Sequence, residues 1–328
     1  MQSLYVSQQG AQLGLTGGRM TLTQNKETVA DVPAEQVERI FLYGHVSVTP
    51  ALLAHLLGRG IPTTLLSQSG YFRGQIVGGI NGQVRRRAAQ YALLAQPDKA
   101  LSVIRELIAA KLDNQHRHLY LKLGGEAPAI SHIRALIESV RTCDDLDRLR
   151  GLEGSAARWH FGAFPALLAE TGFDFPGRHY HPPRDPVNAL LSLGYSLLLS
   201  ELQTGLVSLG LDPYVGLFHA TDGRQPACVL DLMEPLRTLV DRLVLRLLRQ
   251  GTLHTEDFSV TEEGCRLVQG RGRLFYTAWE ELLASEVNWQ DQTLSYRRLI
   301  LVQSQGYVRW LEHPESLPTW FRLHDLGR

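Results

Sequence analysis

Apolar residues change their spacing near Gly82, and this change restricts the chain to a narrow set of folds. Before this point apolar and polar residues mostly alternate, which is the pattern of half-buried strands. After it apolar residues recur about every 3.6 positions, which is the pattern of amphipathic helices. The sequence therefore predicts a multidomain β plus α protein. A small N-terminal β-sheet or β-sandwich domain should be followed by a larger all-α C-terminal domain.

The predicted boundaries follow this change of period. Residues 1–80 should form the β-rich domain, 81–97 a linker with the first helix, and 98–328 the helical domain. Strands are expected at 12–15, 19–23, 39–43, 45–48, 62–66 and 71–77, with a short helix at 51–57 that begins at Thr49 and Pro50. Helices are expected at 83–94, 98–121, 129–140, 153–170, 186–209, 230–248, 272–285 and 294–311, with a hairpin near 258–269.

Composition excludes several classes of protein. A chain of 328 residues that is 44% hydrophobic can bury two cores, and its Gly and Pro content is ordinary, which excludes disordered and fibrous classes. Three cysteines without a Cys-x-x-Cys pair argue against a disulfide scaffold or structural zinc and favour a reducing cytoplasm. The N-terminus predicts no signal peptide, and serine and charged residues interrupt the apolar region 189–211, so a buried helix is expected there rather than a membrane span.

The overall charge does not by itself indicate nucleic-acid binding, because 33 basic residues balance 33 acidic ones. Only four of the basic residues are lysines, so the other 29 are arginines, which can hold phosphate in a bidentate way. A compositional bias of the genome is the simpler reason for this ratio. Arg85, Arg86 and Arg87 are candidate DNA contacts, although such runs are more often a solvated helix face.

A stretch from His219 to Arg237 carries a possible ligand set for a divalent metal. It contains one histidine and two acids, Asp231 and Glu234, just ahead of a long amphipathic helix. Three positions apart, the two acids project from neighbouring points of one helix side, and Pro235 must lie in the first turn or bend the helix. A helix-capping role for Asp231 and a surface ion pair between Glu234 and Arg237 are the simpler alternative.

A second stretch strengthens the metal interpretation. In Leu149-Arg-Gly-Leu-Glu153-Gly-Ser a lone carboxylate stands between glycines, at what the pattern predicts to be the start of a helix. Oxygen ligands suit a hard cation such as Mg²⁺, and one added imidazole shifts the preference towards Mn²⁺.

These segments resemble the family of CRISPR-associated protein one, the integrase of spacer acquisition. The resemblance is carried by Gly-Leu-Glu153-Gly-Ser-Ala-Ala, Gly-Leu-Phe-His219 and Val-Leu-Asp231-Leu-Met-Glu234-Pro-Leu-Arg237, in this order. It extends to Pro-Val-Asn188-Ala-Leu-Leu-Ser-Leu-Gly-Tyr195 and to Lys111-Leu-Asp-Asn-Gln115. Together these segments are highly specific and cover most of the chain.

The resemblance implies a metal-dependent DNA integrase or endonuclease that inserts foreign DNA fragments as new spacers into a CRISPR array. The 3′-hydroxyl of a captured fragment would attack a phosphodiester of the repeat, with Mg²⁺ or Mn²⁺ held by Glu153, His219 and Glu234. Asp231 would be a supporting or alternate ligand, and Arg224 and Arg237 would orient carboxylates or hold phosphate. The resemblance also implies a cytoplasmic homodimer that contacts DNA through its N-terminal domain and binds CRISPR-associated protein two.

Two other classes remain open from the residues alone. A metal phosphoesterase acting on small nucleotides would use the same ligands but would need a closed pocket. A non-catalytic DNA-binding subunit would keep the arginines and tolerate loss of the carboxylates.

Overall fold

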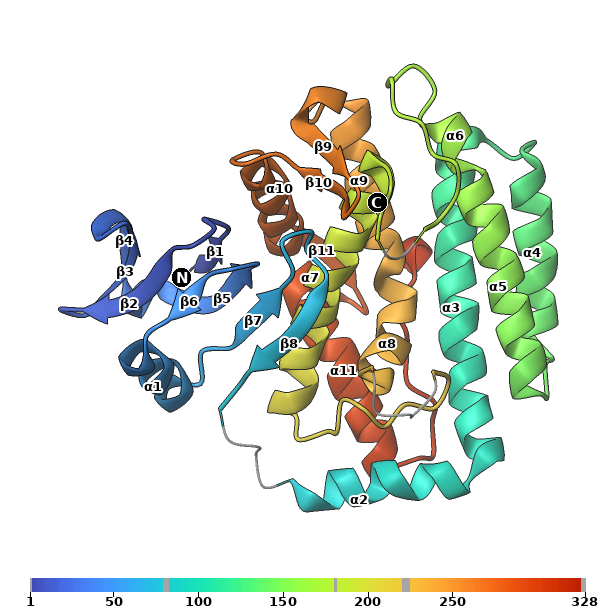
Figure 1. Ribbon diagram of the computed structural model, residues 1–328. Coiled ribbons are helices and arrows are strands. Elements are labelled where there is room, and N and C mark those ends of the chain that lie inside the picture. The colour runs from blue at the N-terminus through green and yellow to red at the C-terminus, as the bar shows by residue number, and fades with distance from the viewer. Residues whose placement is uncertain (1, 79–82, 180–181, 220–224, 326–328) are drawn as a thin grey trace.

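A computed structural model of the chain describes residues 2–78, 83–179, 182–219 and 225–325. A β-rich N-terminal region leads into a mostly helical region, which confirms the predicted fold class (Figure 1). Two small hairpins interrupt the helical region, so it is not purely α. The boundaries at 80 and 97 remain predictions.

The N-terminal region contains two four-stranded sheets. The first has the order β1 (Gln2–Val6), β5 (Val37–Tyr43), β7 (Thr63–Leu66), β8 (Phe72–Ile76), and the second has β4 (Glu27–Pro33), β3 (Arg19–Gln24), β2 (Gln12–Thr16), β6 (Ser47–Val48). Helix α1 (Pro50–Arg59) begins as predicted, because the Thr49 hydroxyl accepts the N–H of Leu52 at 3.3 Å. Strand β4 was missed because it lies at a sheet edge and is largely exposed, which leaves little apolar alternation to detect.

The helical region is built around α7, which is buried along almost its whole length. Its helices are α2 (Val84–Ala92), α3 (Pro97–Leu123), α4 (Pro128–Arg141), α5 (Leu146–Gly162), α6 (Phe164–Leu167), α7 (Pro186–Ser208), α8 (Ala227–Met233), α9 (Arg237–Arg249), α10 (Gly272–Ala284) and α11 (Tyr296–Glu312). Helices α3, α4 and α5 lie side by side at one edge of the molecule (Figure 1). Among the described residues, α7 alone is long and apolar enough to cross a membrane, but 72% of its apolar window is buried in the fold, as in a soluble core helix.

Two hairpins flank α10 in the chain. The predicted one, β9 (Phe258–Thr261) with β10 (Gly264–Leu267), is present. The second, β11 (Glu286–Trp289) with β12 (Gln292–Ser295), was not predicted. Its turn residues Gln290 and Asp291 both adopt a positive φ without a glycine, so the usual sequence signal of a tight hairpin turn is absent.

The helix that carries Glu153 begins earlier than predicted. It was expected at 153–170, but α5 starts at Leu146 because the carboxylate of Asp145 accepts the N–H of Arg148 at 2.6 Å. It ends at Gly162, before the short α6. Glu153 therefore lies in the middle of a helix, and the prediction that it stands at a helix start is wrong.

The single helix predicted at 230–248 is interrupted by a 3₁₀ turn, which we call the bend. Helix α8 ends at Met233, a 3₁₀ turn covers Glu234–Leu236, and α9 begins at Arg237. Pro235 has no N–H to continue the ladder, and Asn114 of α3 donates to its carbonyl at 2.7 Å. Pro235 therefore lies in a 3₁₀ turn between two helices rather than in the first turn of one helix, and Glu234 lies in this turn rather than at a helix start.

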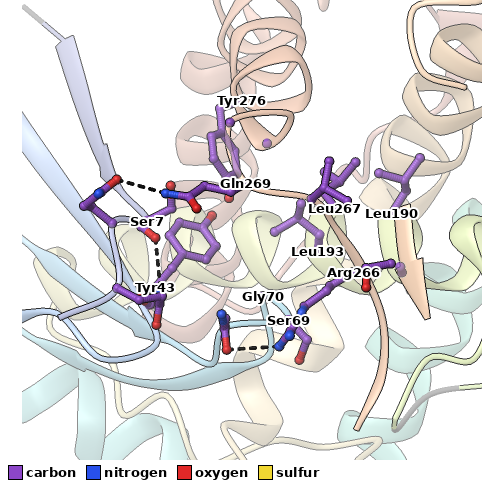
Figure 2. A pocket seen from close by; sticks show the side chains of 18 of the residues that line it. Ser7, Tyr43, Ser69, Gly70, Leu190, Leu193, Arg266, Leu267, Gln269 and Tyr276 are labelled. Atoms are coloured by element: carbon purple, nitrogen blue, oxygen red, sulfur yellow. Dashed lines mark hydrogen bonds between the residues drawn. The ribbon is translucent and has the colours of Figure 1, made fainter. Parts of the chain in front are cut away.

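The two regions meet through aromatic and charged side chains. Tyr5 stacks on Phe41 and on Tyr276, and its hydroxyl donates to Glu280 at 2.6 Å. A cavity of about 470 Å³ lies at this junction (Figure 2). Residues of both regions line it, and none of the predicted metal ligands is among them.

The bend depends on apolar packing beneath it. Leu232 and Leu236 are 2% and 0% exposed, so Leu232→Ala or Leu236→Ala should each lower the free energy of unfolding by about 2–5 kcal/mol through cavity formation. Chemical denaturation measures this loss. Leu121→Ala, at a position 58% exposed on α3, is the matched control and should change stability by less than about 0.5 kcal/mol. Equal losses in core and control variants would contradict this account of the bend.

Candidate metal centre

The three predicted ligands meet at one place, although they lie far apart in the sequence. Glu153 comes from α5, Glu234 from the bend between α8 and α9, and His219 from the segment that precedes α8. The ammonium of Lys111, on α3, contacts Oε1 of Glu153 and Oε2 of Glu234. The Nε2 atom of His219 lies 3.8 Å from Oε1 of Glu234. Glu234 is therefore the common neighbour of Lys111 and His219.

Burial and charge oppose each other at this centre. Burial would raise the pKa of Glu234, but the positive charges of Arg237 and Lys111 outweigh it and lower the pKa to about 2. Burial would lower the pKa of Lys111, but the two carboxylates outweigh it and raise the pKa. The carboxylate of Glu234 and the ammonium of Lys111 are consequently both charged at neutral pH.

Asp231 orients His219. Its carboxylate lies 2.7 Å from Nδ1 of His219 and accepts the backbone N–H groups of Phe218 at 3.0 Å and of His219 at 2.9 Å. A carboxylate acceptor at Nδ1 favours the imidazole tautomer with its proton on Nδ1, which leaves the lone pair of Nε2 on the side of Glu234. Asp231 thus has the contacts of a group that holds the histidine in position.

Further contacts fix the backbone around these side chains. Arg150, one turn before Glu153 on α5, donates to the carbonyl of Phe218 at 2.7 Å and 3.2 Å. Arg237 donates to Oε1 of Glu234 at 2.8 Å. The histidine segment and the bend are therefore both tied to the elements that carry the carboxylates.

The donor set fits a divalent cation. Oxygens of Glu153 and Glu234 already converge on one positive charge, that of Lys111, and Oε2 of Glu234 is buried against this ammonium. Two carboxylates and one imidazole suit Mg²⁺, Mn²⁺ or a related ion. Within the described residues, no three His, Cys, Asp or Glu side chains close into a metal cage, because Lys111 lies between the carboxylates.

The predicted DNA-binding arginines occupy different settings. Arg86 pairs with Glu312 at 2.7 Å and Arg87 donates to the carbonyl of Gly210 at 3.2 Å, so both help to dock α2. Arg85 is exposed on the same helix. Arg224 lies outside the described residues. Among the predicted arginines that the structure describes, Arg237 contacts the metal centre through Glu234.

Lys111 and Arg150 are the site residues that sequence reasoning missed. Lys111 stands in the segment Lys-Leu-Asp-Asn-Gln and is one of only four lysines in the chain, which is the single local signal that could have marked it. A lysine ammonium is a compact point charge with three donors, so it can contact both carboxylates at once.

Comparisons with known proteins give a consistent picture. The family model described as CRISPR associated protein Cas1 matches residues 4–281. The chain is 34% identical over 313 residues to a CRISPR-associated endonuclease Cas1 of Thermus thermophilus, covering 94% of this chain and 93% of the relative. It is 33% identical over 323 residues to a Cas4/Cas1 fusion of Geobacter sulfurreducens, covering 94% of this chain but only 58% of the fusion.

Solved structures share the fold. A casposase bound to its integration product superposes with a TM-score of 0.86 at 22% identity, covering 97% of this chain and 92% of the casposase chain. A chain of a Cas6-RT-Cas1–Cas2 complex gives a TM-score of 0.84 at 22% identity, covering all of this chain and 36% of the other.

The low pKa of Glu234 makes stability depend on pH. A carboxyl whose pKa falls from 4.5 to about 2 on folding stabilises the native state fully above about pH 5, and this contribution is lost as pH falls towards 2. With a chelator present, the stability advantage of the native protein over Glu234→Gln should shrink by about 1.4 kcal/mol between about pH 6 and pH 3.5. Denaturant titrations at the two pH values measure it. An advantage that stays constant or grows on acidification would contradict the ion-paired state of Glu234.

Proposed function

The chain belongs to the family of CRISPR-associated protein Cas1, and on that premise we propose that it is a metal-dependent DNA integrase and endonuclease that inserts foreign DNA fragments into a CRISPR array. The observation that carries the proposal is that Glu153 and Glu234 share the ammonium of Lys111, while Nε2 of His219 lies 3.8 Å from Oε1 of Glu234. The relatives named endonucleases support the enzyme class, and the casposase supports integration as the reaction.

The reaction would be a transesterification at phosphorus. The 3′-hydroxyl of the captured fragment attacks a repeat phosphodiester, the new phosphodiester forms, and the displaced 3′-oxygen of the repeat leaves as a hydroxyl. Water in place of the 3′-hydroxyl gives hydrolysis and so endonuclease activity. A bound Mg²⁺ or Mn²⁺ would supply Lewis acidity and charge neutralisation at the phosphate.

The protein's own residues have distinct tasks in this proposal. Glu153, Glu234 and Nε2 of His219 hold the cation, and Asp231 keeps the imidazole in the tautomer that can bind it. Arg237 holds Glu234 in place through its 2.8 Å contact, and Arg224 is proposed as a phosphate contact. Lys111 balances the two carboxylates before the cation binds, and once displaced by the cation it would supply a positive charge beside the phosphate.

Partners follow from the family. We propose that the protein acts on DNA as a homodimer joined through its N-terminal region, and that CRISPR-associated protein two bridges two such dimers. The likeness to a Cas1 chain within a Cas1–Cas2 complex supports this partner. A cytoplasmic location is proposed because the three cysteines are free and buried and the most apolar helix is packed into the core.

The two alternative classes have less support. A small-nucleotide phosphoesterase needs an enclosed pocket, whereas the side chains of Glu153 and His219 are 22% and 31% exposed. A non-catalytic DNA-binding subunit would have no need for buried carboxylates held by several independent hydrogen bonds.

Loss of the imidazole should separate catalysis from binding. His219→Ala should reduce strand joining and metal-dependent cleavage at least about 100-fold while DNA affinity stays unchanged. Gel assays of joining and anisotropy of labelled duplex measure the two quantities. His313→Ala, an exposed histidine at the end of α11, is the matched control and should retain full activity.

Glu153→Gln tests the same site from α5. It should abolish turnover with little change in melting temperature, because Glu153 is partly exposed and its helix is capped by Asp145. A collapse of the melting temperature would make the role of Glu153 structural, and full activity in either site variant would refute the proposed metal ligands.

Dependence on the partner tests the reaction class. Incubation with a short duplex, a plasmid carrying the array and Mn²⁺ or Mg²⁺ should yield joined products that increase when CRISPR-associated protein two is added. Hydrolysis of small nucleotides, with no joined product under any of these conditions, would favour the phosphoesterase instead.

A further inference from the structure

A basic cavity lies between the C-terminal parts of α3 and α9. It has a volume of about 460 Å³, and its charged lining residues are Lys122, Arg242, Arg246 and Arg249, with no aspartate or glutamate. The three arginines follow one another at i, i+4 and i+7, so they share one face of α9. Because a helix rises about 1.5 Å per residue, Lys122 lies about 16 Å beyond Lys111 along α3. The cavity is therefore separate from the metal centre.

The positive charges of this cavity are not neutralised by the protein. In the part of the chain that the structure describes, none of the four side chains forms an ion pair with a carboxylate, although Arg249 donates to the carbonyl of Leu167 at 3.0 Å. The C-terminal end of a helix carries about half a negative charge and attracts cations. Two such ends would offset only about one of the four charges. The chain as a whole has no net charge, so this excess is local.

A buried histidine with unsatisfied nitrogens also lines the cavity. His118 is 1% exposed, and neither of its ring nitrogens has a hydrogen-bond partner among the described residues. Burial and the neighbouring His160 lower the pKa of His118 to about 3, so the ring is neutral and offers one donor and one acceptor. Buried polar atoms are nearly always paired, so a ligand with polar atoms would complete this site.

We propose that this cavity binds the phosphates of a nucleotide unit, either free or within a single DNA strand. Guanidinium groups bind phosphate oxygens in a bidentate way, and leucine side chains of α9 supply an apolar wall for the sugar or base. The volume falls within the range of about 300–1,000 Å³ that is usual for small-molecule sites. The cavity between the two regions (Figure 2) has one charged lining residue, Arg266, and so lacks the charge to hold phosphate.

The test removes charge at exposed positions. Arg246→Gln combined with Arg249→Gln should weaken binding of a labelled single-stranded oligonucleotide at least about tenfold, measured by anisotropy in EDTA so that the metal centre does not contribute. The slope of log affinity against log salt should fall in magnitude by about 1.4, because each lost phosphate contact on a single strand contributes about 0.7. Lys122→Gln, on the opposite helix α3, should also weaken binding of the oligonucleotide and reduce the slope.

The matched control removes two other charges in the same structural setting. Arg59 and Arg309 are exposed and lie in the last turns of α1 and α11, so the double variant Arg59→Gln with Arg309→Gln should bind like the native protein. His219→Ala should also bind the oligonucleotide in EDTA with native affinity, because the metal centre does not contribute under these conditions. The result for the basic cavity is therefore independent of whether the proposed metal ligands are correct.

A second probe identifies the source of the phosphate. Titration of ATP in EDTA, followed by calorimetry, reports a free nucleotide, and the oligonucleotide reports a strand. Weaker binding of either probe by the cavity variants, with intact circular dichroism, supports the site and assigns its ligand. If the cavity variants and the control variant bind both probes equally well, the proposal is overturned.

Discussion

The contact of one ammonium with two carboxylates holds the candidate metal centre together. Glu153 and Glu234 come from segments about 80 residues apart and approach each other closely enough to share Lys111. Two carboxylates at this spacing would repel each other without a cation between them, and Glu234 is too deeply buried for water to screen the repulsion. A positive charge is therefore a condition for the site to exist, and Lys111 supplies it from α3.

The other contacts of the site hold these charged groups in place. The bend at Pro235 brings Glu234 out of a regular helix, and Asn114 holds the bend from α3, three residues after Lys111. Asp231 anchors the histidine segment through its side chain and backbone, and Arg150 ties the same segment to α5. These contacts join three helical elements before any ligand binds, which reduces the reorganisation required during the reaction.

Much of the fold follows from local patterns, because helices with a long apolar face, such as α3 and α7, depend on spacing that the sequence displays directly. The start of α5 was predicted too far along the chain. Its capping residue, Asp145, precedes the apolar pattern around Glu153 from which the prediction was made. The proposed metal ligands could be named from the sequence through family segments. The contact of Lys111 with the two glutamates could not be predicted, because the contact between α3 and the bend depends on packing between distant parts of the chain. The basic cavity was missed for the same reason, since Lys122 and Arg242 are ordinary surface residues until their helices meet.

The central claim is that Glu153, His219 and Glu234 bind a single divalent cation. Its most direct test is the anomalous scattering of Mn²⁺ in crystals of the protein grown with that ion. The account predicts one strong peak within about 2.0–2.6 Å of carboxylate oxygens from both glutamates and of the histidine nitrogen, with Lys111 withdrawn from between them. The account would be contradicted if the only Mn²⁺ peak lay elsewhere, or if Lys111 still bridged the two carboxylates at saturating Mn²⁺.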